Sequence, residues 1–207
     1  MLPKHQPTNI CDKQDLITSL IKHENKDSMG RNLARFDSAG YDRGRNKIWQ
    51  ALWFATSFLI FQRFWCPNRW RTSLLRFFGA NVGATAFIRN DVRIMWPWKL
   101  TVGSNCWLGE GLRIINLEPI TIGNDVCISQ GVMLCTGSHD HRKADFPYRN
   151  APISIDSGAW IGARATVLPG VNIGRCSVVA AGEVVRSNLP DLSMQINGKI
   201  RELREPE

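Results

Sequence analysis

The stretch AWIGARATVLPGVNIG, Ala159 to Gly174, repeats one chemical pattern every six residues. Its aliphatic residues Ile161, Val167 and Ile173 stand six positions apart, and a glycine follows the first and the last of them. A period of six fits neither an amphipathic helix, whose period is about 3.6, nor a meander of hairpins. It predicts a parallel β-solenoid, in which each short strand ends at a corner and each aliphatic side chain points to the axis.

The same rhythm runs along the chain from Val82 to Val185. It shifts by two residues twice, and it breaks for one long interval between Leu134 and Ile155. Because each turn of a solenoid buries its apolar face only against its neighbours, many turns are needed for stability. Fifteen hexads supply about five three-sided turns. The repeated aliphatic positions are Val82, Ile88, Ile94, Val102, Leu108, Ile114, Ile122, Ile128, Leu134, Ile155, Ile161, Val167, Ile173, Val179 and Val185.

The composition is that of a globular protein. With 207 residues and 43% hydrophobic content, the chain is long enough for one well-buried domain with an appendage. The net charge of +8 is uneven, because residues 1–80 carry 13 basic and 6 acidic side chains. Such an excess suits nucleic acid, an anionic membrane surface or a solvated face, and we recognise no nucleic-acid module.

The six cysteines form no CxxC pair and we see no secretory leader, so we expect reduced thiols in a cytoplasmic protein, without a zinc site.

Two helices are expected before the solenoid. One covers residues 47–65, and the other covers residues 68–78 and docks on the open N-terminal end of the solenoid. The apolar run over residues 51–61 is about half the length that a bilayer requires. It therefore packs inside the protein, which we favour, or lies in a membrane interface. The second helix is expected to present on one face Trp70, Leu74, Phe77 and Phe78.

The chain thus divides into four expected parts. Residues 1–46 are expected to be poorly structured, with a weak helical pattern over residues 15–26, and residues 47–80 to form a helical cap. Residues 81–190 are expected to form the solenoid, with a loop over residues 138–152, and residues 191–207 a C-terminal tail.

The hexads VGSNCW, IGNDVC, IGARAT and IGRCSV make the chain resemble the hexapeptide-repeat acyltransferases. Longer segments, among them LLRFFGANVG, INLEPITIG, ISQGVMLCTGSHD and VVAAGEVV, most resemble the colanic-acid-biosynthesis acetyltransferases, relatives of the maltose and galactoside O-acetyltransferases. This resemblance covers roughly residues 40–200. It implies an all-β fold, a left-handed parallel β-helix with an N-terminal helical extension. The handedness rests on the resemblance alone, because parallel crossovers are usually right-handed. The chain departs from the family at its end, where INGKIRELRE replaces a GNPA turn.

The resemblance implies an acetyl-CoA-dependent O-acetyltransferase whose acceptor is a saccharide or glycan precursor. The segment matching SHD carries the catalytic histidine in that family, so the role passes to His139. A neutral imidazole can take the proton of an attacking hydroxyl and return it to the leaving thiolate. Its tautomer needs a partner, which Asp140 or a loop carbonyl could supply. Ser138 is expected near the acceptor, and His141 lies outside the matching motif.

Further site residues follow from the same resemblance. Asn116 in INLEP matches an asparagine that contacts the acceptor, although an asparagine that only turns a corner is the alternative. No metal is expected. The pantetheine arm of acetyl-CoA is expected along Gly162, Ala180 and Ala181, and its phosphates near Arg186 and Lys199.

Related solenoids form trimers with the site between neighbouring coils, which implies a homotrimer in which His139 faces the next chain. The basic N-terminal third allows peripheral association with the inner face of a membrane.

One alternative function is that of a non-catalytic solenoid for binding or assembly. The polar loop after Leu134 argues against it. Another is a zinc carbonic anhydrase, which needs three imidazoles where the solenoid offers only His139 and His141.

Overall fold

The computed structural model describes residues 30–38 and 40–204. They belong to two compact units. The first is the chain up to Ser38 together with Asp140–Pro147, and the second is Ala39–His139 together with the chain from Tyr148 onward. The first unit includes a short 3-10 helix, η1 (Leu33–Arg35). The weak helical pattern over residues 15–26 lies outside the described residues.

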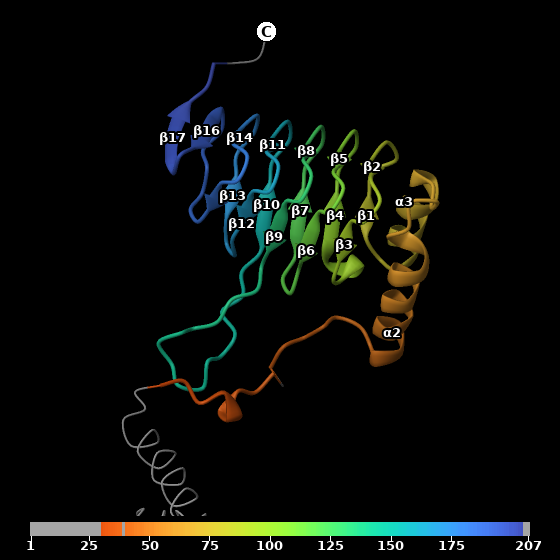
Figure 1. Cartoon of the computed structure of the whole chain (residues 1–207), viewed down its shortest axis with the longest axis vertical. Helices are drawn as coiled ribbons and strands as arrows, with labels where there is room; N and C mark the ends of the chain where they lie inside the picture. The colour runs from red at the N-terminus through yellow and green to blue at the C-terminus, as the bar shows by residue number, and fades with distance from the viewer. Residues whose placement is uncertain (1–29, 39, 205–207) are drawn as a thin grey trace, which may run out of the picture. The chain divides into compact units, whose positions relative to one another are not determined.

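The second unit is a solenoid of parallel β-strands, as the six-residue repeat predicts (Figure 1). Each turn adds one strand to each of three sheets, and five complete turns are followed by β16, which begins a sixth. Sheet A consists of β1 (Asn81–Val82), β4 (Leu100–Val102), β7 (Ile120–Ile122), β10 (Ile153–Ile155) and β13 (Asn172–Ile173). Sheet B consists of β2 (Phe87–Ile88), β5 (Trp107–Leu108), β8 (Cys127–Ile128), β11 (Trp160–Ile161), β14 (Val178–Val179), β16 (Ser193–Ile196) and β17 (Lys199–Glu202). Sheet C consists of β3 (Arg93–Ile94), β6 (Arg113–Ile115), β9 (Met133–Cys135), β12 (Thr166–Val167) and β15 (Val184–Val185).

Columns of stacked aliphatic residues form the core. Val82, Val102 and Ile122 occupy matched positions in neighbouring strands of sheet A, and similar columns run through sheets B and C. Every aliphatic residue of the predicted repeat is buried, with at most 5% of its surface exposed. The repeat therefore predicts the residues of the core as well as the fold.

All three irregularities of the repeat lie at one corner, where the chain passes from sheet C to sheet A. We call it the CA corner, and we call the corner between sheets B and C the BC corner. The extra residues at the CA corner are the 3-10 helix η3 (Pro97–Lys99) in the first turn, residues 116–119 in the second and residues 136–152 in the third. Successive corners are tied together, because the Thr136 hydroxyl accepts a hydrogen bond of 2.8 Å from the Glu118 amide.

Three helical segments precede the first strand: α2 (Lys47–Thr56), the π-helical turn η2 (Ser57–Phe61) and α3 (Asn68–Phe77). The Asn46 side chain begins α2 by accepting a hydrogen bond of 2.9 Å from the Trp49 amide. The prediction of one helix over residues 47–65 is confirmed as far as Phe61, although the last turn is π-helical and the final four residues are not helical. The α-helix ends at Thr56, and the π-helical turn continues only to Phe61.

The predicted face of α3 is confirmed only in part: Phe78 is buried and Leu74 packs against the core, but Trp70 and Phe77 do not. Trp70 and Phe77 are 50% and 65% exposed, whereas Arg71 and Leu75 are buried. Burial lowers the pKa of Arg71, and a cation can be buried only when its donors are satisfied. The Arg71 guanidinium satisfies them by donating to three backbone carbonyls, those of Phe61 (3.0 Å), Ile88 (3.3 Å) and Arg63 (2.7 Å). These bonds join α3 to the turn before it and to the first turn of the solenoid.

The segment expected to be a C-terminal tail extends sheet B. β16 pairs in parallel with β14, and β17 returns antiparallel to β16. The Gly198 amide in the turn of this hairpin donates to the Glu183 carboxylate over 3.1 Å. Within residues 30–38 and 40–204, no helix is long and apolar enough to cross a bilayer.

Candidate active site

The long excursion at the CA corner begins as a closed stem. The Ala151 amide donates to the Thr136 carbonyl over 3.0 Å, and the Arg149 amide donates to the Ser138 carbonyl over 2.7 Å. An antiparallel bridge between His139 and Tyr148 follows. The predicted base, His139, is therefore held on a hydrogen-bonded ladder that grows directly from the solenoid.

Aromatic contacts fix the surroundings of His139. Its imidazole stacks on the Tyr148 ring, with centroids 4.9 Å apart and planes at 30°. The Tyr148 ring in turn contacts Tyr41, with centroids 5.5 Å apart. The chain has only two tyrosines, and both lie here. We did not predict either from the sequence, where their rarity was the only signal.

Tyr41 is anchored to the CA corner. Its phenol oxygen accepts a hydrogen bond of 2.7 Å from the Trp96 indole and donates one of 3.3 Å to the Leu117 carbonyl. Burial raises the pKa of Tyr41 to about 12, so the phenol stays neutral and serves as a fixed support. The ammonium of Lys99 lies 4.9 Å from the centre of the Tyr41 ring.

Asp140, expected as one of two candidates to orient the imidazole, is engaged with Arg142. The Arg142 guanidinium donates to both carboxylate oxygens, over 2.9 and 3.2 Å. These hydrogen bonds lower the pKa of Asp140 to about 2. The carboxylate is therefore ionised at neutral pH and committed to a neighbour within its own unit.

Asn116, expected at the acceptor, is fully buried in the CA corner. Its amide oxygen accepts from the Trp96 amide over 2.9 Å, and its amide nitrogen donates to the Trp96 carbonyl over 2.6 Å. Both polar ends of the side chain are thus used to join two successive corners. This geometry favours the alternative stated for Asn116, a residue that turns a corner.

The residues expected to hold the cofactor meet at the BC corner. Gly162 and Ala180 lie in successive turns there, and Ala181 lines an open groove of about 750 Å³. A Cβ on Gly162 would stand 2.6 Å from the Ala181 amide nitrogen, so only glycine allows the two turns to stack this closely. The groove is lined by Gln130, Gly131, Ala163, Arg164, Ala181 and Gly182. The sequence prediction missed Arg164, which brings a cation to the groove.

The two cations expected at the phosphates lie apart. Lys199 begins β17, next to the hairpin turn that Glu183 binds, and Glu183 follows Gly182 of the groove. Arg186 instead follows β15, where the chain leaves sheet C. The structure thus brings Lys199 toward the BC corner, whereas Arg186 lies at the CA corner.

His139 and the groove lie at opposite edges of sheet C. The groove lies where the chain enters β9, β12 and β15, and His139 belongs to the excursion that begins where β9 ends. Within one chain, the predicted base and the predicted cofactor groove therefore occupy different corners of the solenoid.

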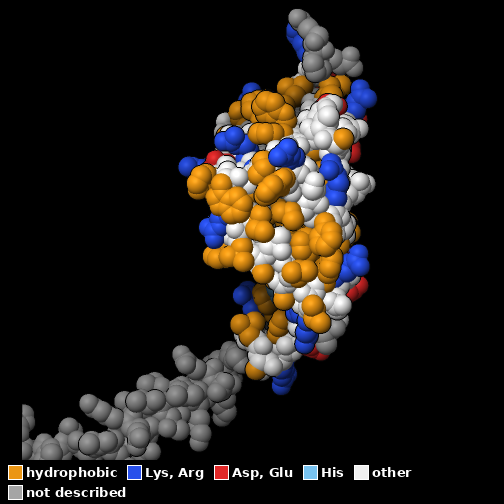
Figure 2. Space-filling model, turned by 90° about the vertical axis from the view of Figure 1, so that its right-hand side faces the viewer, with side chains coloured by type: hydrophobic (Ala, Val, Ile, Leu, Met, Phe, Trp, Pro, Cys, Tyr) orange, Lys and Arg blue, Asp and Glu red, His pale blue; other side chains and the backbone are white. Residues whose placement is uncertain are grey.

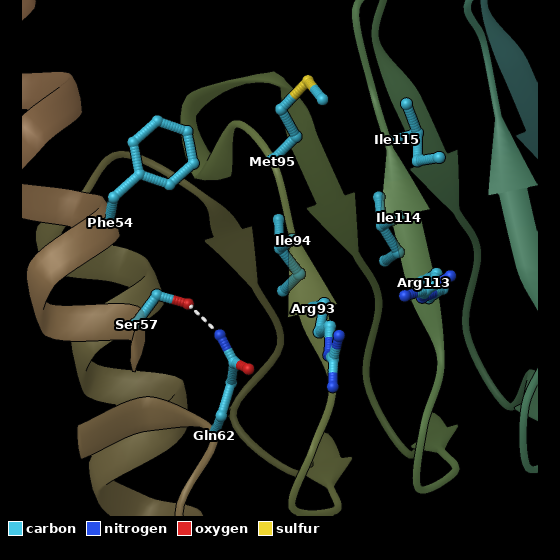
Figure 3. Close-up of a pocket in the computed structure, with 9 residues that line it drawn as sticks. All are labelled: Phe54, Ser57, Gln62, Arg93, Ile94, Met95, Arg113, Ile114 and Ile115. Atoms are coloured by element: carbon cyan, nitrogen blue, oxygen red, sulfur yellow. Dashed lines mark hydrogen bonds between the residues drawn. The ribbon is translucent and has the colours of Figure 1, made fainter. Parts of the chain in front are cut away.

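A second pocket, of about 380 Å³, lies between the helical cap and the outer face of sheet C (Figure 3). Phe54 of α2 forms one wall, and Met95 and Ile115 form the wall toward the CA corner. Ile115 pairs with Cys135 in the next turn, from which the stem of His139 starts. The pocket therefore adjoins the turn that carries the predicted base.

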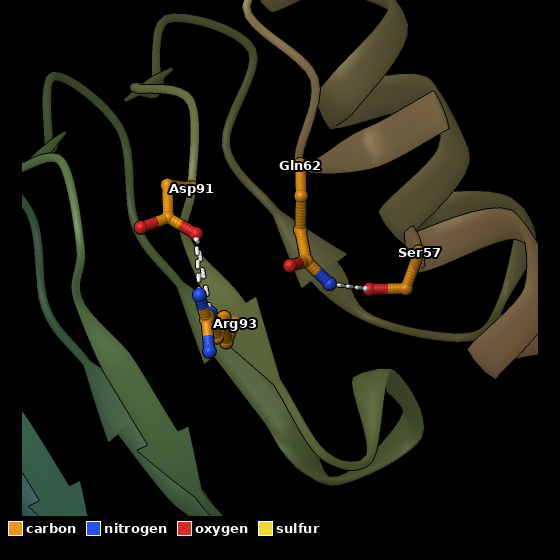
Figure 4. Close-up of polar contacts among 4 residues, drawn as sticks. All are labelled: Ser57, Gln62, Asp91 and Arg93. Carbon is orange, nitrogen blue, oxygen red and sulfur yellow. Dashed lines mark hydrogen bonds and ion pairs between the residues drawn. The ribbon is translucent and has the colours of Figure 1, made fainter. Parts of the chain in front are cut away.

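Polar groups enter this pocket from both sides. The Gln62 amide donates to the Ser57 hydroxyl over 2.9 Å, and the Arg93 guanidinium binds Asp91 over 3.1 Å (Figure 4). Arg113 stands one turn above Arg93, in register with it. Among the described residues, no acidic group pairs with Arg113. The pocket therefore offers an apolar wall together with one guanidinium available to an anion.

The structure gives no support to a metal centre within its described part. Residues 30–38 and 40–204 contain no group of three or more His, Cys, Asp or Glu side chains placed to hold a metal ion.

Comparison with known proteins adds an independent observation. No profile of a known protein family matches the sequence. A protein of Escherichia coli K12 described as the colanic acid biosynthesis acetyltransferase WcaF is 44% identical over 151 residues, which are 72% of this chain and 82% of that protein. The galactoside O-acetyltransferase of the same organism is 32% identical over 139 residues, which are 65% of this chain and 68% of that protein.

Solved structures show the same architecture. A hexapeptide-repeat acetyltransferase of Vibrio cholerae superposes with a TM-score of 0.67 at 25% identity, over 76% of this chain and 92% of that one. Another structure of that Vibrio cholerae protein contains acetyl coenzyme A.

Proposed function

This chain belongs to the hexapeptide-repeat acetyltransferases, which use acetyl-CoA, and from that premise we propose that it acetylates a hydroxyl of a saccharide with His139 as general base. The observation that carries the assignment of the base is the closed stem, which presents the His139 ring stacked on Tyr148. An imidazole held in one orientation on a rigid scaffold supports this role, because a general base must be positioned toward the proton that it removes.

The proposed reaction uses one residue twice. The neutral imidazole of His139 accepts the proton of the acceptor hydroxyl as its oxygen attacks the thioester carbonyl of acetyl-CoA. A C–O bond forms and gives a tetrahedral intermediate. When that intermediate collapses, the C–S bond breaks, and the imidazolium returns the proton to the departing thiolate. The products are the acetyl ester and coenzyme A.

The groove at the BC corner is our candidate for the pantetheine arm. Much of its lining is backbone, because Gly131, Ala181 and Gly182 have little or no side chain to keep a ligand away. Arg164 in the groove and Lys199 beyond it supply positive charge for the phosphates.

Since His139 and this groove occupy different corners, we propose that the site is completed between neighbouring chains. A ring of three identical chains would place the CA corner of one chain beside the BC corner of the next and would form three equivalent sites. Ser138, whose carbonyl belongs to the same stem, would then face the shared cleft.

The pocket beside the helical cap is our candidate for the acceptor. Its volume suits one or two sugar rings, and it combines an apolar wall with polar groups, as ligand pockets generally do. The saccharide class is supported by the two relatives, one described as acting in colanic acid biosynthesis and one as a galactoside O-acetyltransferase. Arg113 suggests an acceptor with an anionic group nearby.

The test is release of free thiol from acetyl-CoA across a panel of sugars and nucleotide sugars, with the product identified as an acetyl ester by mass spectrometry. We expect at least one saccharide to stimulate thiol release, and His139→Ala to remove the stimulation. A folded protein that binds sugars but releases no thiol with any of them would instead support a non-catalytic solenoid.

A further inference from the structure

The segment formed by α2 and η2 is apolar on every side. No charged side chain lies between Lys47 and Arg63. A helix of this kind is normally surrounded by a protein core or a membrane. Here only one stripe is buried, with Trp53, Ser57 and Phe61 against the rest of the protein. Phe54 also contacts Trp96 of the solenoid, whereas Ile48, Phe58 and Leu59 are 81%, 63% and 59% exposed.

Large exposed apolar side chains gather on this part of the molecule. Of the fifteen in the described residues, nine lie between residues 48 and 77, which makes them a patch and not a random scatter. Phe58 and Phe64 are 63% and 85% exposed. Figure 2, which faces the helical end of the solenoid, shows hydrophobic side chains spread over that face with Lys and Arg among them.

Along the chain that forms the patch, the charge has one sign. Between Asp42 and Asp91 the chain has eight Lys or Arg residues and no Asp or Glu. Lys47 and Arg63 stand at the two ends of the apolar helix, and the Arg63 guanidinium lies 4.6 Å from the centre of the Phe58 ring. Long cationic side chains that lie along apolar surface can hold their charge at a polar boundary.

We propose that this cap surface, residues 47–70, docks on an anionic phospholipid membrane. Phe58, Leu59 and Phe64 enter the interface between headgroups and acyl chains, and Lys47, Arg63 and Arg69 contact the headgroups. A second copy of the chain would fit the cap surface less well than a membrane does. Two such surfaces in contact would bring their cations together, and Asp91, which contacts Gln62, already pairs with Arg93, whereas an anionic membrane compensates these cations.

The experiment is flotation of the full-length protein with vesicles. We expect the protein to float with phosphatidylcholine vesicles containing about a quarter phosphatidylglycerol and to remain behind with phosphatidylcholine alone. Raising the salt from about 0.1 to about 0.5 M lowers the bound fraction, because screening weakens the charge contribution. The pair Phe58→Ser and Leu59→Ser lowers the ratio of bound to free protein at least about tenfold, because it removes inserted apolar surface.

Arg63→Glu is expected to weaken binding at least about fivefold to anionic vesicles. The matched control is Arg175→Glu, which makes the same charge change on an exposed residue between β13 and β14, in the last complete turn of the solenoid. A second pair, Ile48→Ser and Leu52→Ser, tests the other end of α2, and circular dichroism checks that each variant is folded.

Failure of the folded wild type to float with anionic vesicles overturns the proposal, and so does flotation that none of these substitutions lowers. If the Phe58 and Leu59 pair dissociates an oligomer in sedimentation while the wild type ignores vesicles, the surface is an interface between copies of the chain. Acetyl transfer is measured separately on soluble sugars, so neither result depends on the proposed chemistry.

Discussion

The imidazole of His139 stacks on the phenol ring of Tyr148, with centroids 4.9 Å apart and planes inclined by 30°. The same two residues form the bridge that closes the stem of the long excursion. Stacking restrains the ring, because the imidazole can turn only by losing its contact with the phenol ring. Backbone and ring contacts therefore act together to position the proposed base.

Replacement of His139 by alanine is expected to lower kcat at least about a hundredfold, because it removes a positioned base. The measurement is thiol release from acetyl-CoA with a saturating sugar acceptor. His141→Ala is the matched control, since that histidine is exposed and lies outside the stem. Equal losses in both variants would mean that the excursion matters for folding and not through the His139 imidazole.

Tyr148 is expected to act through His139 as a positioning residue. Tyr148→Ala should lower kcat about tenfold, because the imidazole loses the ring that restrains it. Tyr148→Phe keeps an aromatic ring at the same place and should restore most of the rate. A Phe variant as slow as the Ala variant would show that the phenol hydroxyl, and not the stack, supports turnover.

Asn116 offers a test between a structural role and acceptor binding. Asn116→Ala leaves the Trp96 amide buried without a partner and removes one of the two donors to the Trp96 carbonyl, which should lower the free energy of unfolding by about 2 kcal/mol. The measurement is chemical denaturation. The KM for the acceptor should stay unchanged in protein that remains folded. A stable variant with a raised KM would return Asn116 to the acceptor site.

The fold could be predicted because one short-range signal specifies it. In a parallel solenoid every turn repeats the same environment, so residues such as Ile161, Val167 and Ile173 report their burial directly through their spacing. The residues of the BC corner could be predicted for the same reason. Gly162 and Ala181 are close because they stand in successive regular turns, and the resemblance to known enzymes pointed to both.

The rest depends on contacts that spacing does not encode. Tyr41 and Tyr148 are more than a hundred residues apart and meet only because two irregular segments return to one corner. The buried face of α3 was predicted only in part, because the hydrophobic pattern favours Trp70 over Arg71. Three carbonyl acceptors outside the helix reverse that order, and they cannot be read from the helix itself.

The groove at the BC corner can be tested without disturbing the core. Ala181 is exposed, so Ala181→Leu should leave the melting temperature unchanged while its larger side chain occupies the groove. We expect the KM for acetyl-CoA to rise at least about tenfold and the KM for the sugar to stay the same. An unchanged KM for acetyl-CoA would place the cofactor elsewhere on the solenoid.

Arg113 tests what the acceptor carries. It stands in register with Arg93, but Arg93 is paired with Asp91, so Arg113 is the guanidinium able to bind an anion in the pocket beside the cap. Arg113→Ala should raise the KM at least about tenfold for acidic saccharides and leave neutral ones unaffected, because only the former lose a charged hydrogen bond. Arg113→Lys should recover part of the affinity, since it restores the charge without the planar fork. Equal effects on neutral and acidic acceptors would mean that Arg113 shapes the pocket and does not select its ligand.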